Sequence, residues 1–447
     1  MHYKAKQLWS LLVALSMVSI WLVACGGGSS SSNGGKVTLS FQRFFGECSD
    51  QYKGVTDLSK AHAECGIIQV LTNKWNAEHP NIQIQTDVVD GGTYYQKISS
   101  EIASGSPPDI ALMHGVELPS FASRHTLLPL GDKLAKAGVD ANDFLPAALN
   151  NASYGGKLYA LPFDVHTILL HINMDLFKKA GLVDAQGNPK IPNSPDEFLA
   201  EARQMKERTG KQFVIAQSDA DVGTDWSLSS FIWQQGGDVF SSDLKKSSIN
   251  TPEGARALKL MTDLIKGGYF TPNVKDTNAM FLNGDVASII NGTWAVDQFD
   301  QQVKSGQAAF KNYRAAPFPN VFGNAAAWSN SHTWVIPART NQDPAKVDAA
   351  IQFMKYLYDN NLTWARTGHF PARKSVLTSP DYTSLPHRSE YAQSAQIARG
   401  YPRIQQIDAF EATMREEMLG VYLGQKTPAQ GLASAQQRVD AILNQGG

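Results

Sequence analysis

Short strand-like and helix-like segments alternate from Lys36 onward, and this alternation constrains the fold more than any other feature of the sequence. Strand-like segments alternate apolar and polar residues, whereas helix-like segments repeat apolar residues every three or four positions. In chain order the segments are Val37–Phe41 (strand), Ile67–Trp75 (helix), Ile82–Val88 (strand), Tyr94–Ala103 (helix) and Asp109–Met113 (strand). A repeated strand, helix, strand order predicts an open, largely parallel α/β sheet. In such a sheet, ligands bind beyond the carboxyl ends of the strands.

A second α/β block begins near Tyr159. Strands are expected at Leu158–Phe163, Ile168–Ile172 and Val286–Ile290, and helices at Met174–Ala180, from Ser194 onward, and over Asp225–Gln235, Pro252–Lys266 and Thr427–Asn444. Ser194 and Thr251 are suited to cap the helices that follow them, because a side-chain hydroxyl can accept from a free backbone N–H of the first turn. A chain of 447 residues with these segments is expected to form two or three domains.

Composition excludes several classes of protein. Lys plus Arg number 40 and Asp plus Glu 41, so the formal net charge is −1, and there is no excess of positive charge to bind a nucleic acid. Three cysteines in so long a chain do not make a disulfide-rich miniprotein. After the N-terminus, no window holds the roughly 18 consecutive apolar residues of a membrane-spanning helix. We therefore expect a soluble body.

The N-terminus has the pattern of an export signal over residues 1–24. Basic residues precede an apolar stretch, Leu8–Val23, and Ala24 stands directly before Cys25. Residues 22–25 (LVAC) resemble the lipobox of bacterial lipoproteins, in which the signal is cleaved before the cysteine and the cysteine carries lipid. Residues 25–35 then form a Gly/Ser linker with no apolar face to bury. The alternative is an uncleaved signal anchor in which Cys25 is incidental.

Export also affects the other two cysteines. Cys48 and Cys65 lie 17 positions apart, and outside a reducing cytosol a disulfide closing such a loop contributes about 3 kcal/mol in the chain-entropy model. We expect a Cys48–Cys65 disulfide. The alternative, a metal site that uses His62, lacks the paired spacing of metal-binding motifs.

Motifs of catalysis are absent from the sequence. There is no GxSxG, HExxH, phosphate-binding loop or GxGxxG after a strand, and the ten histidines are scattered. A glycoside hydrolase needs two carboxylates at a defined separation, but Asp and Glu are too common for any pair to count. A secreted glycoside-active enzyme is the less favoured alternative, as is a lipid-anchored adhesion lipoprotein. We predict no enzyme activity, no cofactor and no metal site.

Short segments in order along the chain resemble a known family. They are Ser106–Ile110, Tyr154–Pro162, Ile172–Phe177, Phe281–Ala287, Asn291–Trp294, Thr367–Pro371 and Leu423–Pro428. Behind a lipobox, this set resembles the extracellular solute-binding proteins of ATP-driven transporters, in the maltose and glycerol-phosphate group (family 1). The resemblance covers essentially all of residues 36–445.

The resemblance implies a fold and a division of the chain. The expected fold is the type II, two-lobe α/β periplasmic-binding-protein fold, with the ligand in a cleft between the lobes. Residues 36–162 with about 291–317 are expected to form lobe one, and residues 163–290 with about 318–447 lobe two. The expected crossings between lobes lie near Pro162–His166, Asn291 and Pro317–Pro319.

A sugar site needs flat aromatic side chains beneath the ring and polar groups around its edge. By the resemblance, Trp294 matches a stacking tryptophan of maltose-type proteins, and Trp226 falls at an aromatic position that lines the cleft. Core packing is the alternative for Trp294, and Trp233 is expected in the core. Asp164 and His166 follow the first crossing, where relatives place a carboxylate, although His166 could instead be a buried structural histidine.

Further ligand-binding candidates come from the strand ends and from the family resemblance. Phe45 and Glu47 follow the first strand, and His114 and Glu117 follow the third. Trp328–His332 (WSNSH) replaces a Gly-Gly stretch that often contacts ligand in the family, and the candidates within it are Trp328, Ser329 and Asn330. Arg403 aligns with an arginine that serves the ligand in glycerol-phosphate-type proteins, and a solvated surface role is its alternative. Glu411 stands where maltose-type relatives carry an aromatic residue, which argues against a plain maltodextrin site.

The resemblance implies the substrate-binding lipoprotein of an ATP-driven importer, which captures a sugar or oligosaccharide and delivers it to the permease. The alternative ligand is a phosphorylated polyol such as glycerol phosphate, with Arg403, Arg373 or a helix N-terminus as the anion contact. The expected partners are the ligand, the transmembrane permease and the membrane through the lipid anchor, but no nucleic acid. The protein is expected to be an exported monomer, anchored to the cell membrane and facing the periplasm or the cell exterior.

Overall fold

The computed structural model describes residues 36–217 and 222–444, and Cys25 and the rest of the predicted signal and linker lie outside these residues. The first part of the described chain contains β1 (Val37–Arg43), α1 (Ala63–Glu78), β2 (Ile82–Val88), α2 (Tyr94–Ala103), β3 (Ile110–His114), α3 (Leu118–Ala122), α4 (Gly131–Lys136), α5 (Pro146–Asn151), β4 (Ser153–Tyr154), β5 (Lys157–Leu158) and β6 (Ala160–Pro162). Two short 3₁₀ helices cover Leu58–Lys60 and Ala141–Asp143.

The middle of the chain contains β7 (Asp164–Asn173), α6 (Met174–Ala180), α7 (Pro195–Thr209), β8 (Gln212–Ala216), α8 (Val222–Gln234), α9 (Pro252–Lys266), α10 (Thr277–Leu282), β9 (Val286–Gly292), α11 (Ala295–Lys304), β10 (Tyr313–Pro317) and β11 (Ala327–Asn330). The last part contains β12 (His332–Val335), α12 (Pro344–Asp359), α13 (Asn361–Ala365), β13 (Phe370–Pro371), α14 (Lys374–Leu377), α15 (Pro380–Thr383), α16 (Arg388–Tyr391), α17 (Ser394–Ile397), β14 (Ala398–Arg399), α18 (Ile407–Tyr422) and α19 (Pro428–Asn444).

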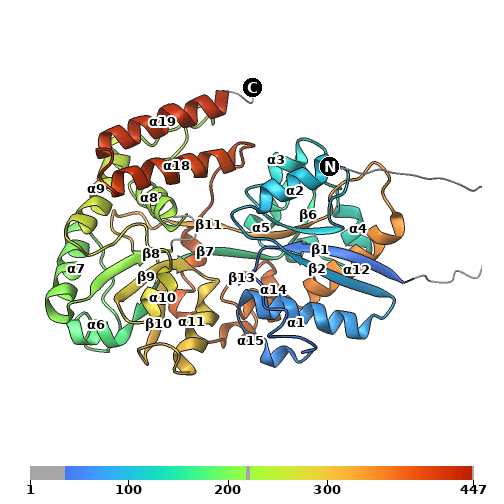
Figure 1. Cartoon of the computed structure of the whole chain (residues 1–447), viewed down its shortest axis with the longest axis horizontal. Helices are drawn as coiled ribbons and strands as arrows, with labels where there is room; N and C mark the ends of the chain where they lie inside the picture. Colours follow the sequence, from blue (N-terminus) through green and yellow to red (C-terminus); the bar gives the residue numbers. More distant parts are fainter. Residues whose placement is uncertain (1–35, 218–221, 445–447) are drawn as a thin grey trace, which may run out of the picture. The chain divides into compact units, whose positions relative to one another are not determined.

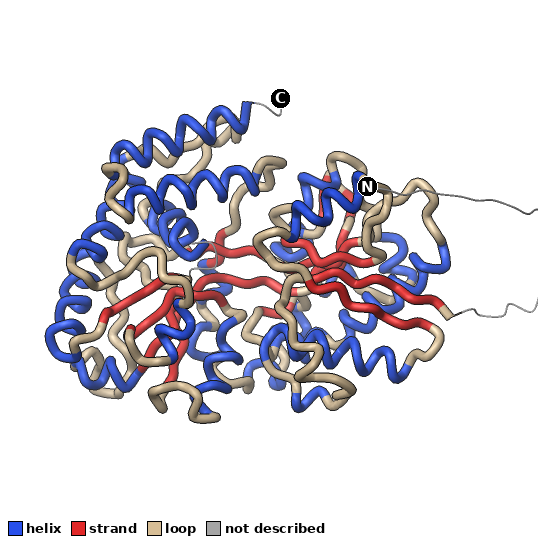
Figure 2. Tube along the Cα trace, viewed as in Figure 1, coloured by secondary structure: helices blue, strands red, loops and turns tan. Residues whose placement is uncertain are grey.

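Two main sheets carry the fold, with helices around both (Figures 1 and 2). The first has the order β2-β1-β3-β12-β6, in which β1 pairs in parallel with both β2 and β3. The second has the order β14-β11-β7-β9-β8, with β10 and β13 also paired to β7. Every strand that pairs with β7 runs antiparallel to it. The fold is thus the predicted two-lobe α/β fold, one sheet to each lobe.

Local sequence signals identify several elements correctly. The strand at Ile82–Val88 and the helix at Tyr94–Ala103 have the predicted bounds. Ser194 accepts from the backbone N–H of Glu197 and so caps α7, and Thr251 caps α9 in the same way through Gly254. The helix α6 ends at Gly181, whose φ of 74° lies in the left-handed region that glycine adopts without steric cost.

The path of the chain between the lobes differs from the prediction in two places. We assigned residues 291–317 to lobe one, but β10 pairs with β7 in the second sheet. We assigned residues 318–447 to lobe two, but β12 lies between β3 and β6 in the first sheet. The physical reason is burial: Trp334 on β12 is fully buried, and its ring centroid lies 4.6 Å from that of Phe41 on β1. Only a strand inside the first sheet gives it that contact.

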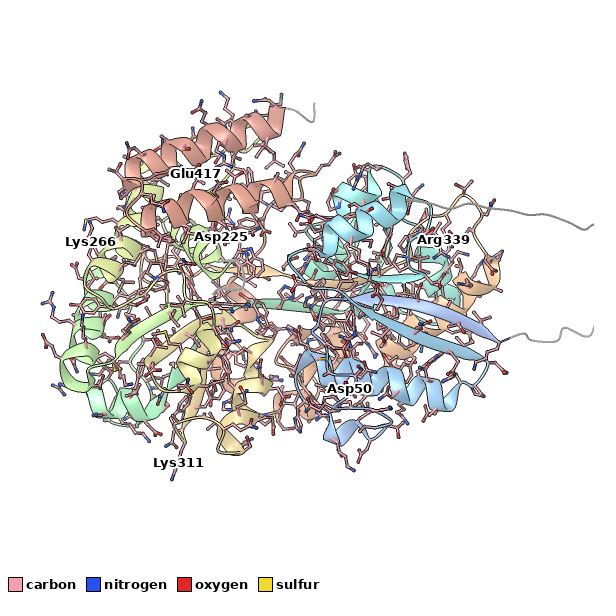
Figure 3. All side chains as sticks on the ribbon, in the orientation of Figure 1. Asp50, Asp225, Lys266, Lys311, Arg339 and Glu417 are labelled. Atoms are coloured by element: carbon pink, nitrogen blue, oxygen red, sulfur yellow. A yellow bond between two sulfur atoms is a disulfide. The ribbon has the colours of Figure 1, made fainter. Side chains whose placement is uncertain are left out.

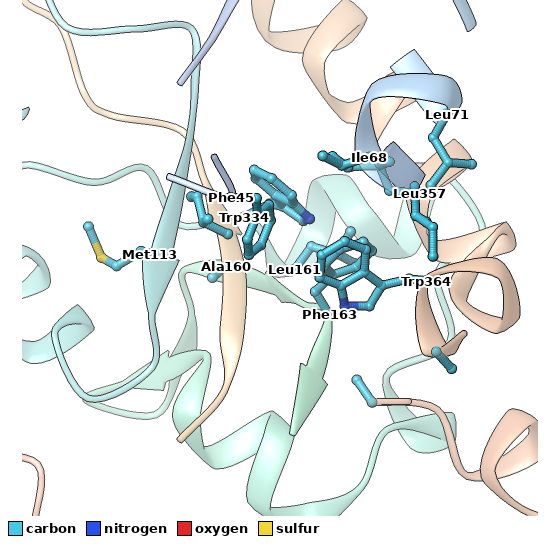
Figure 4. Packing of buried hydrophobic residues seen from close by; sticks show 14 of the residues in the cluster. Phe45, Ile68, Leu71, Met113, Ala160, Leu161, Phe163, Trp334, Leu357 and Trp364 are labelled. Atoms are coloured by element: carbon cyan, nitrogen blue, oxygen red, sulfur yellow. The ribbon is translucent and has the colours of Figure 1, made fainter. Parts of the chain in front are cut away.

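Two hydrophobic clusters form the core. The first lies around the first sheet and extends to Phe281 and Phe299 beside the second, whereas the other cluster packs α7, α8, α9, α18 and α19 against the second sheet. Figure 4 shows Phe163, Trp334 and Trp364 together within the first cluster. The rings of Phe163 and Trp364 are stacked with centroids 4.6 Å apart. Phe163 connects β6 to β7, so this packing fixes one crossing between the lobes.

The predicted disulfide is present between Cys48 and Cys65. It joins the segment after β1 to the first turn of α1, as expected for a loop inserted between a strand and a helix. Among the helices of the described residues, none combines the length and the apolar character needed to cross a membrane.

Candidate functional site

Two connections between the sheets lie side by side and create the candidate site. Phe163 joins β6 of the first sheet to β7 of the second, and Ser331 joins β11 of the second sheet to β12 of the first. His166 on β7 pairs with Asn330 on β11, while His332 on β12 pairs with His114 at the end of β3. Side chains from both lobes therefore meet at this junction.

Asp164 is the centre of a buried hydrogen-bond network at the junction. Its carboxylate is fully buried and accepts from the backbone N–H of His332 at 2.9 Å and from His332 Nδ1 at 2.8 Å. It also accepts from His166 Nδ1 at 3.1 Å and from Trp364 Nε1 at 2.7 Å. Burial opposes the charged form, but His332, His369 and these hydrogen bonds hold the pKa of Asp164 well below its usual range. The predicted site residue Asp164 therefore orients its neighbours.

Four histidine rings surround this carboxylate. The ring centroid of His332 lies 4.4 Å from that of His166, 5.1 Å from that of His114 and 5.4 Å from that of His369. Burial lowers the pKa of His166 to about 3 and the pKa of His114 well below its usual value. Burial also disfavours the charged form of His332, yet the Asp164 carboxylate raises its pKa. The sequence analysis identified His114 and His166 as separate candidates but did not place the four rings together.

Three tryptophans continue the junction into the second lobe. Trp226 on α8 stacks on Trp328 of β11, with ring centroids 3.7 Å apart and an interplanar angle of 12°. The ring of Trp294 stands edge-on to both Trp226 and His166, at centroid distances of 6.0 and 5.5 Å. Trp328 is buried, whereas Trp226 and Trp294 are half-buried. One face of Trp226 is therefore supported by Trp328, and Trp294 packs against both hydrophobic clusters.

Carboxyl groups border these aromatic rings. Burial raises the pKa of Glu117 well above its usual value, and the Asp408 carboxyl beside it adds to the shift. Burial similarly raises the pKa of Asp225 on α8 (Figure 3), with Glu411 as the second cause, and it raises the pKa of Glu411 itself to about 7. Arg415 offers one compensating charge, with Nη1 4.0 Å from Glu411 Oε2. This part of the junction is acidic.

The remaining predicted residues occupy different positions. Phe45 is buried, with its ring edge-on to that of His332 at 4.9 Å, whereas Glu47 is exposed and accepts from the Ser49 backbone N–H. Ser329 pairs with Thr167, and Asn330 Oδ1 accepts from the Val116 backbone N–H at 3.3 Å. Arg403 donates from Nη1 to the Asn150 carbonyl at 2.5 Å, so it connects the second lobe to α5 of the first.

Several residues at the junction were missed by the sequence reasoning. The Tyr95 hydroxyl lies 2.9 Å from His114 Nδ1, and the Phe44 ring stacks on that of His114 at 4.7 Å. His369 lies between Thr293 and Glu64, at 2.9 and 2.8 Å. Of these, His369 had a usable signal, because it stands within the Thr367–Pro371 segment that carried the family resemblance.

The fold and the junction define a two-lobed binding protein, and comparison with known proteins specifies which kind. The sequence matches the family described as bacterial extracellular solute-binding protein over residues 65–361. The chain belongs to this family, and its role is solute binding outside the cytoplasm.

Individual relatives are distant but cover most of the chain. The arabinooligosaccharide-binding protein of Bacillus subtilis is 25% identical over 400 residues, covering 86% of this chain and 84% of the relative. The sn-glycerol-3-phosphate-binding periplasmic protein UgpB of Escherichia coli K12 is 23% identical over 407 residues, covering 84% of this chain and 89% of the relative. Among solved structures, the GacH receptor of Streptomyces glaucescens has a TM-score of 0.77 at 23% identity, covering 92% of this chain and 99% of that receptor. This last likeness concerns the fold alone.

Proposed function

We propose that the protein captures a carbohydrate at the junction and delivers it to the transmembrane permease of an ATP-driven importer, without a catalytic step. The observation that carries the proposal is the half-buried pair Trp226 and Trp294, set among imidazole and carboxyl groups. Tryptophan faces bind the C–H groups of a sugar ring, and the polar groups hydrogen-bond its hydroxyls. The arabinooligosaccharide-binding relative agrees with this choice.

The predicted ligand-binding residues divide into two groups in this proposal. Trp226, Trp294 and His114, which are half-buried, contact the sugar, and the buried His166 and Glu117 beside them offer polar groups to its hydroxyls. Asp164, Phe45, Trp328, Ser329 and Asn330 instead hold these residues in place, because they are buried and packed or hydrogen-bonded within the protein. Glu47 is exposed beyond β1 and has no part in the proposed contact. Arg403 lies at the border between the lobes.

The balance of charge disfavours a phosphorylated polyol. Glu117, Asp225, Asp408 and Glu411 interact with one another, with Arg415 as the charged partner of Glu411. Burial favours the neutral forms of Glu117, Asp225 and Glu411, so these carboxyls offer a phosphate dianion no opposite charge, and Arg415 beside them already faces Glu411. Arg373, one of the two arginines suggested as anion contacts, is already paired with Asp143 at 2.7 Å. Arg403 is the remaining candidate.

A thermal-shift screen distinguishes the two ligand classes. We expect a neutral sugar or oligosaccharide, such as an arabino-oligosaccharide or maltose, to raise the melting temperature, because a ligand at 100 times its Kd stabilises the native state by about 2.7 kcal/mol. Glycerol 3-phosphate should have little effect. Three results together would contradict the sugar proposal. Glycerol 3-phosphate would give the larger rise in melting temperature, added salt would reduce that rise, and Arg403→Ala would abolish it.

We further propose that the mature protein begins at Cys25, is acylated there and is held at the membrane as a monomer by the lipid. Each acyl CH₂ buried in the membrane contributes about 0.8 kcal/mol, so several chains anchor a protein without a helix. Cys25→Ser should move the protein from the membrane fraction to the soluble fraction while sugar affinity stays unchanged. Mass spectrometry that finds an unmodified Cys25 in the native N-terminal peptide would contradict the proposal.

A further inference from the structure

Three histidines at the junction form a group with the composition of a metal site. His114 at the end of β3, His166 on β7 and His332 on β12 each place one ring nitrogen within 4.8 Å of those of the other two. His166 and His332 are buried and His114 is half-buried. Two of the rings belong to the first sheet and one to the second. The sequence analysis named His114 and His166 as separate candidates but not as one group, because 52 or more positions separate each histidine from the next.

The Nδ1 atoms of all three rings already have hydrogen-bond partners. His166 Nδ1 lies 3.1 Å from Asp164 Oδ1, and His332 Nδ1 lies 2.8 Å from Asp164 Oδ2. His114 Nδ1 lies 2.9 Å from the Tyr95 hydroxyl, which also accepts from the His114 backbone N–H at 2.8 Å. A hydrogen bond to Tyr95 therefore holds Nδ1 in either tautomer of the His114 ring. Within residues 36–217 and 222–444, no hydrogen bond reaches Nε2 of these rings. Because a carboxylate only accepts, Asp164 keeps the protons of His166 and His332 on Nδ1 and the lone pairs on Nε2.

This is the arrangement that proteins use to prepare histidine for a metal. A metal-binding imidazole almost always donates its other N–H to a carboxylate, carbonyl or water, which fixes both the tautomer and the orientation of the ring. Imidazole nitrogens suit zinc, copper, iron and nickel, whereas calcium and magnesium prefer oxygen ligands. Zinc is often bound by three histidines, with a fourth position left for water or substrate.

His369 is less suited to the same role, although it lies beside the group. Its Nδ1 is 2.9 Å from Thr293 Oγ1 and its Nε2 is 2.8 Å from Glu64 Oε1, so both of its nitrogens are occupied. Asp164 could serve as a direct ligand only by giving up its donors. The set with unoccupied nitrogens is therefore His114, His166 and His332.

We propose that His114, His166 and His332 bind one zinc ion, with Asp164 and Tyr95 orienting the rings. Because the three ligands come from both sheets, the ion would connect the two lobes beside the tryptophans of the proposed sugar site. The proposal goes beyond sugar binding, but it shares His114 and His166 with the proposed sugar contacts, so a bound zinc ion would occupy ring nitrogens that would otherwise face a sugar hydroxyl.

Isothermal titration with ZnCl₂ tests the proposal on the full chain, purified without a polyhistidine tag and treated with a chelator. We expect one zinc ion to bind per chain, and Co²⁺ in its place to give the visible absorption of a tetrahedral site. His114→Asn and His332→Asn remove Nε2 but keep a polar atom close to the position of Nδ1, so each should weaken zinc binding by more than the 10- to 100-fold typical of an orienting residue. Asp164→Asn should weaken zinc binding by 10- to 100-fold, as expected for a residue that orients the ligands.

His125→Asn is the matched control, because His125 is exposed, lies outside the histidine group and has a φ of 56° that asparagine tolerates. It should leave zinc affinity unchanged, and thermal melts should show that all the variants fold. His114 is half-buried, so its variant keeps the test informative if His332→Asn does not fold. The absence of saturable zinc binding overturns the proposal, as does equal affinity in His114→Asn and the parent. If the sugar still binds in that case, the proposed function stands without the metal.

Discussion

Replacing Asp164 with alanine should lower the free energy of unfolding by about 3 to 5 kcal/mol, the range for breaking a buried charged pair. The carboxylate is fully buried and accepts from His332 twice, from His166 and from Trp364. Alanine leaves these donors buried without an acceptor, and each such group costs about 1 to 3 kcal/mol. Urea unfolding at neutral pH with a chelator present measures the loss.

Two variants make this prediction specific. Asp164→Asn keeps an acceptor oxygen and a similar shape, so it should lose less stability than Asp164→Ala. Asp359→Ala removes an exposed carboxylate paired with Lys355, which should cost about 0 to 1 kcal/mol. If Asp164→Ala is no less stable than Asp359→Ala, Asp164 does not hold the junction together.

The parts of the fold that could be predicted are those whose signal is local. The bounds of Ile82–Val88 and Tyr94–Ala103 follow from the period of their apolar residues, and the caps at Ser194 and Thr251 follow from single hydroxyls. The two-lobe fold followed from these segments together with the family resemblance. The Cys48–Cys65 bridge followed from spacing and compartment.

The path between the lobes could not be predicted, because it depends on packing between distant segments. The short apolar strand His332–Val335 fits either sheet by its pattern, and the contact of Trp334 with Phe41 decides between them. The family resemblance implied a crossing near Pro317–Pro319, but the chain instead crosses at Ser331.

The candidate site was predicted residue by residue but not as an assembly. Asp164, His166, Trp226 and Trp294 were identified, and the structure brings them together. The partners that give Asp164 its role, His332 and Trp364, lie 168 and 200 positions away. No spacing rule connects residues so far apart, so neither the hydrogen-bond network nor the histidine group could be derived from the sequence.

Trp226→Ala and Trp294→Ala should each weaken sugar binding by about 2 kcal/mol or more, as expected for a buried aromatic anchor. Both rings are half-buried at the junction and stand edge-on to each other, and Trp328 supports Trp226 from one side. Calorimetry with the sugar that gives the largest thermal shift measures the affinity. Trp294 also packs against both hydrophobic clusters. The free energy of unfolding of the Trp294→Ala variant therefore has to be measured without ligand, alongside its sugar affinity.

Trp233→Ala is the matched control, because Trp233 lies on α8 with Trp226 but is only 2% exposed. It should lose about 3 to 5 kcal/mol of folding stability, while the folded fraction binds sugar with nearly the parent affinity. If Trp294→Ala behaves like Trp233→Ala, Trp294 belongs to the core and not to the site.

A phosphate site would give another pattern: Arg403→Ala would lose more affinity than either tryptophan variant, and binding of glycerol 3-phosphate would weaken with salt. A sugar site requires instead that both tryptophan variants bind weakly and that salt has little effect.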